Sequence, residues 1–106
     1  MTIRAKDILH QGLKRFWLSG GLDNTGISIT WANRLRETLA HLDHAHSPED
    51  VLNDLGRLLQ ISAVPGSPQL YRMPIKQGWI LQFRIEDPDS GAVTHIDIVQ
   101  LPPGQH

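Results

Sequence analysis

Three polar side chains in the last quarter of the chain have the chemistry of an acid–base site. His95 and Asp97 are two residues apart in a strand-like segment, so both side chains are expected on one face of a sheet. An imidazole transfers protons near neutral pH, and the Arg84 guanidinium can stabilise a negatively charged transition state. We therefore predict a catalytic site of Arg84, His95 and Asp97. The alternative is a solvated sheet face on which Arg84 pairs with Asp97.

A group of histidines lies at the end of a predicted helix. His41 and His44 are spaced to meet on one helix face, and His46 follows beyond the expected helix end. A zinc site needs three or four converging ligands. We interpret these histidines instead as residues favoured by the negative end of the helix dipole. Because the sequence also lacks cysteine and a glycine-rich phosphate loop, we predict no metal and no cofactor.

The size and composition of the chain indicate one folded domain over residues 1–106. Hydrophobic residues make up 40% of the 106 residues and charged residues 20%, as in globular proteins. Ten basic and eleven acidic residues give a net charge of −1, whereas non-specific nucleic-acid binding usually accompanies a basic excess. The sequence has no apolar run of about 18 residues and no signal-peptide pattern, so we expect a cytoplasmic protein without a membrane partner.

The first half of the chain has the apolar spacing of helices. Residues 8–18 form the first expected helix, which Asp7 caps and Gly20 follows. In a second helix, apolar residues recur at helical spacing and form one stripe. The members of this stripe are Trp31, Leu35, Leu39 and Leu42. Ser47 caps a further short segment, and Gly56 is expected to end the helical half.

In the second half the apolar period changes to two, which predicts strands. The expected strands cover residues 58–62, 70–76, 79–87 and 92–101, with residues 2–4 as a short edge strand. Pro74 predicts a bulge or an unpaired N–H position, and Ile96 and Ile98 are expected on the core face. Residues 87–91 are expected to form a turn and residues 102–106 a tail. This order favours an α+β fold, with two N-terminal helices packed on one face of a mainly antiparallel, four- to five-stranded twisted sheet.

Several segments of the chain have a characteristic joint order and spacing: GLKRFW at residues 12–17, ANRLR at 32–36, SPED at 47–50, W-x-L-x-FR at 79–84 and IDIV at 96–99. In this order and spacing the chain resembles the HigB-type toxins of the RelE/ParE superfamily. Toxins of this family pair with a helix-turn-helix antitoxin, enter the ribosomal A site and cut mRNA. The resemblance therefore implies a RelE-like fold, a HigA-like antitoxin, and an mRNA interferase that acts on ribosome-bound mRNA.

The resemblance also implies which residues contact RNA. In this family the RNA 2′-OH attacks the adjacent phosphate, basic side chains hold that phosphate, and a general acid or base moves the proton. The cleft is lined by outward residues of the sheet and by the last strand. Arg84 and Arg57 match basic positions of the family pattern. With Arg72 and Lys76 of the strand half, they are the expected RNA-binding residues.

Other family positions hold residues that cannot perform this chemistry. Ile80 and Pro74 stand where the family typically has arginines, and Ser62 stands where it has a lysine. Residues 100–102 read Gln-Leu-Pro where the family ends its last strand with Asp-Tyr-His. Loss of a general acid or base costs about 10²- to 10⁴-fold in rate, so we expect weak cleavage or none. The alternatives are a catalytically silent module that binds an antitoxin or another protein, and a ParE-like gyrase inhibitor.

Overall fold

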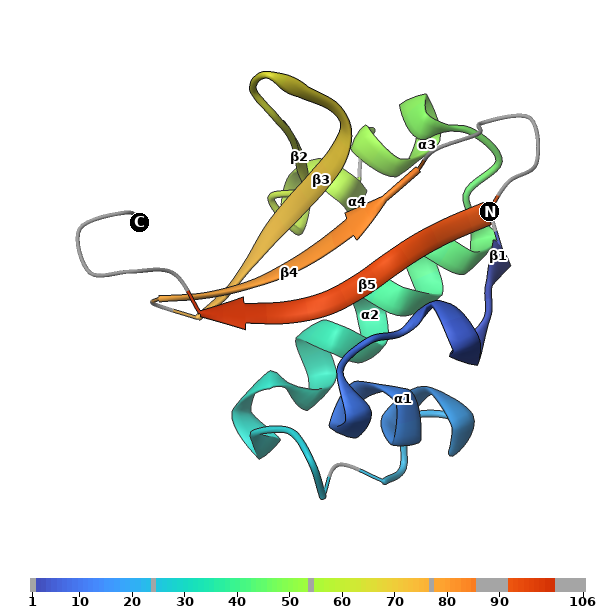
Figure 1. The fold of residues 1–106 in the computed structure, drawn as a ribbon, viewed down its shortest axis with the longest axis vertical. Coiled ribbons are helices and arrows are strands. Elements are labelled where there is room, and N and C mark those ends of the chain that lie inside the picture. Colours follow the sequence, from blue (N-terminus) through green and yellow to red (C-terminus); the bar gives the residue numbers. More distant parts are fainter. Residues whose placement is uncertain (1, 24, 54, 77, 86–91, 101–106) are drawn as a thin grey trace.

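The computed structural model describes residues 2–23, 25–53, 55–76, 78–85 and 92–100 (Figure 1). Its helical segments are η1 (Ala5–Asp7), α1 (Gln11–Leu18), η2 (Ile29–Trp31), α2 (Ala32–His44), α3 (Pro48–Leu52) and α4 (Leu55–Leu58). Its strands are β1 (Thr2–Ile3), β2 (Ser62–Val64), β3 (Ser67–Lys76), β4 (Trp79–Arg84) and β5 (Ala92–Gln100). The turn expected at residues 87–91 and the tail expected at 102–106 lie outside the described residues.

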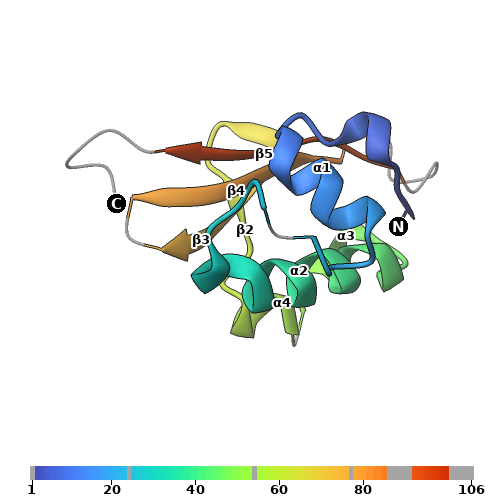
Figure 2. The same cartoon turned by 90° about the horizontal axis from the view of Figure 1, so that it is seen from below.

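The five strands form one sheet in the order β1-β5-β4-β3-β2. β1 runs parallel to β5, whereas the other neighbouring strands are antiparallel. Figure 2 shows α2 on one side of this sheet, and α1 contributes Leu13 and Phe16 to the core that α2 and the strands share. The predicted α+β class and the mainly antiparallel sheet are confirmed. None of the helices in the described ranges is long and apolar enough to cross a membrane.

Apolar residues on one face of the sheet pack against the helices. Leu35, Leu39 and Leu42 of α2 are buried, as their spacing predicts. They share one core with buried strand residues, which include Tyr71, Met73, Leu81, Phe83, Ile96 and Ile98. The residues between these on β3, β4 and β5 point to the opposite side, which we call the open face. Its residues are Leu70, Arg72, Pro74, Ile80, Gln82, Arg84, Thr94, His95, Asp97 and Val99.

The first α-helix begins later than the sequence predicts. After η1 the chain runs beside β5, where the Leu9 N–H donates to the Ile96 carbonyl over 2.7 Å. His10 caps α1, because its Nδ1 accepts a backbone N–H of the first turn. The expected cap at Asp7 and the expected helical start at Ile8 are therefore wrong. Contact with β5 keeps residues that have helical spacing out of the helix.

Two short helices lie between α2 and β2 in the sequence. The first, α3, begins as predicted, with the Ser47 hydroxyl accepting a backbone N–H. The strand expected over residues 58–62 is wrong, because α4 occupies its start and β2 begins only at Ser62. Gly56 lies within α4 instead of ending the helical half. A Cβ at Gly56 would overlap the Val51 carbonyl, so glycine allows α4 to pack closely against α3.

Arg34 joins α2 to β3 and to the segment after α4 through two hydrogen bonds. Its Nε donates to Pro74 O over 2.9 Å, and its Nη2 donates to Leu59 O over 2.8 Å. A lysine ammonium lacks the planar fork that holds both carbonyls. We expect Arg34→Lys to lower the free energy of unfolding by about 1–2 kcal/mol, measured by urea denaturation. Arg57→Lys at an exposed position of α4 is the control, and equal stability of the two variants would contradict the bridging role.

Candidate functional site

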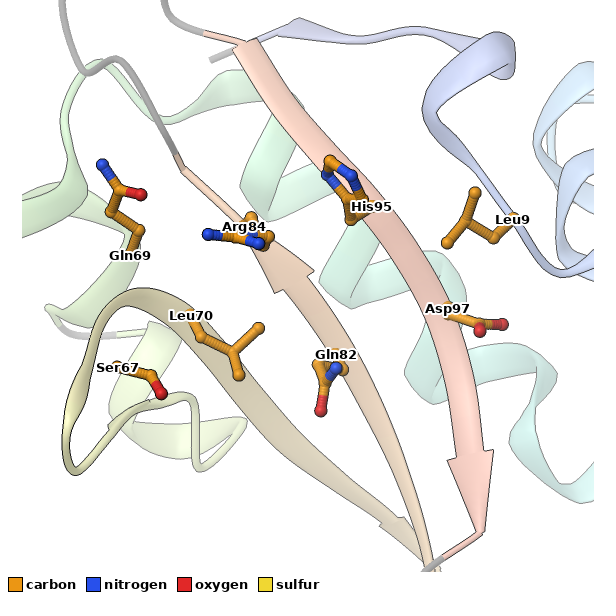
Figure 3. Close-up of a pocket in the computed structure, with 8 residues that line it drawn as sticks. All are labelled: Leu9, Ser67, Gln69, Leu70, Gln82, Arg84, His95 and Asp97. Atoms are coloured by element: carbon orange, nitrogen blue, oxygen red, sulfur yellow. The ribbon is translucent and has the colours of Figure 1, made fainter.

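A groove of about 380 Å³ lies on the open face of the sheet. Figure 3 shows its side chains projecting from β3, β4, β5 and the segment before α1, with α2 behind the strands. Its lining residues are Leu9, Ser67, Gln69, Leu70, Gln82, Arg84, His95 and Asp97. The structure therefore brings the three predicted catalytic residues, Arg84, His95 and Asp97, into the lining of one groove.

A β-bulge in β5 places His95 on the open face. Arg84 pairs with Thr94, and the preceding open-face residue of β4 pairs with Asp97, so two residues of β5 lie opposite one residue of β4. His95 adopts a left-handed backbone with φ 52°, which few residues other than glycine take. The extra residue lets Ile96 stay in the core while His95 remains exposed.

His95 and Arg84 lie on adjacent strands within the groove (Figure 3). The His95 side chain is exposed, and its Nδ1 lies 3.0 Å from Thr94 Oγ1. Arg84 is half-buried, and Thr94 is its direct partner across the strands. This arrangement sets a proton-transfer group beside a fixed positive charge, which suits a ligand with an anionic phosphate.

Asp97 lines the same groove, but its carboxylate has another direction. Its Oδ1 accepts the Ile98 N–H over 2.9 Å. Figure 3 shows the carboxylate turned toward the outer edge of β5, away from Arg84. A charged side chain in this position protects a strand edge from pairing with another chain. The geometry therefore favours His95 and Arg84 as the groups that act on a bound ligand. Asp97 lies at the margin of the groove.

The predicted RNA-binding residues divide between the two sides of the sheet. Arg72 is exposed on the open face, opposite a residue that lines the groove. Lys76 follows the predicted bulge in β3, and its Nζ lies 3.4 Å from Thr30 Oγ1 in η2. Arg57 is exposed on α4. Of these four residues, Arg72 and Arg84 share the open face, whereas Lys76 and Arg57 lie with the helical segments.

Pro74 and Ile80 belong to an apolar row beside the groove. Pro74 pairs with Ile80, which in turn pairs with Val99 on β5. Ile80 is 6% exposed and is not part of the main core. These side chains offer a phosphate no hydrogen-bond donor. The positive charge at the groove therefore comes mainly from Arg84, with Arg72 next to it.

His41 and His44 of α2 do not line the open-face groove. His41 Nε2 donates to Val51 O over 3.0 Å, which ties α2 to α3. His44 is exposed at the end of α2. Within the part of the chain that the structure describes, no three histidine, aspartate or glutamate side chains are placed to hold a metal ion. The open-face groove is the candidate site with converging polar groups of different chemistry.

Thr94 is a residue of this site that the sequence analysis does not identify. A signal for it exists in the spacing of the buried residues of β5. Val93, Ile96 and Ile98 are buried, so the core positions are first three and then two residues apart. This spacing is typical of a strand with one extra residue, and it places the bulge next to Thr94.

No protein-family model matches this sequence, and no curated protein matches it. The function must therefore be inferred from the groove and its residues.

Proposed function

We propose that this chain is the toxin of a type II toxin–antitoxin pair, similar to HigB and RelE, and that its open-face groove binds mRNA. The observation that supports this best is the placement of Arg84 and His95 in one groove on the last two strands. A phosphodiester carries the negative charge that a guanidinium binds, and RNA supplies its own nucleophile, the 2′-OH. The proposed substrate is an RNA phosphodiester in the ribosomal A site, which sets the action of the toxin in the cytoplasm.

His95 is the proposed proton-transfer group. During cleavage the 2′-oxygen loses its proton and attacks the adjacent phosphorus, and the bond from phosphorus to the 5′-oxygen breaks. The imidazole accepts the proton of the 2′-OH and returns it to the 5′-oxygen. The products are a 2′,3′-cyclic phosphate and a 5′-hydroxyl. Arg84 stabilises the additional negative charge on the phosphate oxygens in the transition state.

The apolar row at Pro74 and Ile80 determines the expected rate. Loss of one well-placed donor to a transition-state charge costs about 10²- to 10³-fold, so the proposed toxin is a slow mRNA interferase. With a net charge of −1, the chain also has little attraction for free RNA. Cleavage is therefore expected on ribosome-bound mRNA, because the ribosome itself holds the substrate in place.

Induced expression with and without the adjacent gene tests the toxin function. We expect growth arrest from the chain alone, and normal growth when a neighbouring helix-turn-helix antitoxin is expressed with it. Primer extension in a reconstituted translation system should show cuts within A-site codons, with ribosome-free mRNA as the control. Unimpaired growth together with intact ribosome-bound mRNA would exclude the toxin function.

A second candidate is a catalytically silent module that binds a protein partner. Leu18, Leu22 and Ile29 are 68%, 86% and 78% exposed, and a partner that buried these apolar side chains would be stabilised by their removal from water. A hollow of about 150 Å³, lined in part by Phe16 and Leu39, lies between α1 and α2. A stable complex with the adjacent gene product, without growth arrest, would favour this function. Failure to form a complex at micromolar concentration would oppose it.

A further inference from the structure

We infer that Thr94 is a positioning residue that fixes the His95 ring for proton transfer, an inference that rests on the proposed function of the groove. Thr94 Oγ1 and His95 Nδ1 are 3.0 Å apart, which is a normal hydrogen-bond distance. The threonine side chain is β-branched and has few rotamers, so its hydroxyl is a well-defined partner for the ring. Thr94 thereby engages one of the two nitrogens of the proposed general base.

The β-bulge creates this contact. In a regular strand the side chains of neighbouring residues point to opposite faces, so the backbone would separate Thr94 from His95. The left-handed conformation at His95, with φ 52°, instead turns its ring to the face that Thr94 shares with Arg84. One local feature of β5 therefore brings a hydroxyl, an imidazole and a guanidinium to the same part of the open face.

The contact has two consequences for proton transfer. Because Nδ1 faces Thr94, we assign Nε2 of His95 to the RNA. An Nε2 that accepts a proton requires the hydrogen of the neutral imidazole on Nδ1, and Thr94 Oγ1 can accept that hydrogen, which favours this tautomer. The contact also disfavours rotamers in which this exposed ring points away from the groove, and correct orientation is itself a source of rate. Thr94 acts on the RNA through His95.

Two substitutions separate the hydroxyl of Thr94 from the shape of its side chain. Thr94→Val keeps the branched shape and the strand preference, whereas Thr94→Ser keeps the hydroxyl. Long-range proton–nitrogen NMR of the imidazole reports the tautomer, with the His95 signals assigned by their loss in His95→Asn. We expect the Nδ1–H tautomer to dominate in the wild type and in Thr94→Ser, and a mixture of both tautomers in Thr94→Val.

Cleavage of ribosome-bound mRNA provides the second readout. Thr94→Val should cut about three- to tenfold more slowly, the loss expected for one hydrogen bond. Thr94→Ser should restore the wild-type rate. If Thr94→Val has the same tautomer ratio as the wild type, Thr94 does not position the His95 ring. This conclusion holds whatever the cleavage rate of the variant. If the tautomer ratio of His95 depends on Thr94 but the wild-type protein does not cut mRNA, the contact between Thr94 and His95 is supported. The nuclease function would then be rejected.

Discussion

Replacing His95 with asparagine is expected to slow the cleavage of ribosome-bound mRNA by about 10²- to 10⁴-fold. An asparagine amide does not transfer protons near neutral pH, so the 2′-OH loses its proposed base. Asparagine does tolerate a left-handed backbone such as φ 52° at His95, and the bulge should therefore survive the substitution. A single-turnover assay with saturating ribosomes measures the chemical step rather than binding.

The matched control is His44→Asn. It makes the same substitution at an exposed histidine at the end of α2, which does not line the groove. We expect this variant to cut at the wild-type rate. If His95→Asn also cuts at the wild-type rate, His95 has no part in the mechanism, and the proposed site would be reduced to a binding surface around Arg84.

Gly12→Ala is expected to lower the free energy of unfolding by about 1–3 kcal/mol. Gly12 is buried in α1, and a Cβ at this position would overlap the backbone carbonyl of Gly26 in the loop before η2. In an unhindered helix the same change stabilises by about 1 kcal/mol, because alanine is the better helix former. The sign of the measured change therefore reports whether α1 approaches the loop closely. Urea denaturation gives both the sign and the size.

Gln11→Ala at the neighbouring exposed position controls for helix propensity. It should leave stability unchanged or raise it slightly, because alanine is also a better helix former than glutamine. If Gly12→Ala proves more stable than the wild type, the close contact between Gly12 and Gly26 does not exist. In that case α1 would lie farther from the loop before η2.

The helices could be predicted where the determining pattern is local. Leu35, Leu39 and Leu42 recur at helical spacing, and all three are buried in α2. The start of α3 follows equally well from a capping serine before a proline, Ser47 and Pro48. These features depend on residues within a few positions of each other, so the sequence alone contains the information.

Elements that depend on long-range pairing were predicted less well. Ile8 has the spacing of a helical residue, yet it bridges Ile96 of β5 and lies outside α1. Residues 58–62 have the composition of a strand, but α4 extends through Leu58 and the strand that pairs with β3 begins at Ser62. No local pattern in the sequence determines which of several short apolar segments will pair with a distant strand.

In the candidate site, too, local patterns predict some features, whereas others depend on pairing between distant strands. The strand period alone places Arg84 on the side of β4 that points away from the core, and Arg84 and His95 both line the groove. The contact between Thr94 and His95, and the turn of the Asp97 carboxylate toward the outer edge of β5, depend on the bulge. A bulge changes the face of every later residue in a strand, and its position follows from the register with β4.

Chemical-shift mapping with a short, non-cleavable 2′-O-methyl RNA most directly tests where the protein binds RNA. NMR detects millimolar binding, which suits a protein with a net charge of −1. We expect the largest shift changes at Gln82, Arg84, Thr94 and His95 on the open face, and no change along the exposed side of α2. Changes confined to the helices, or none at millimolar RNA, would contradict the assignment of the groove as the RNA site.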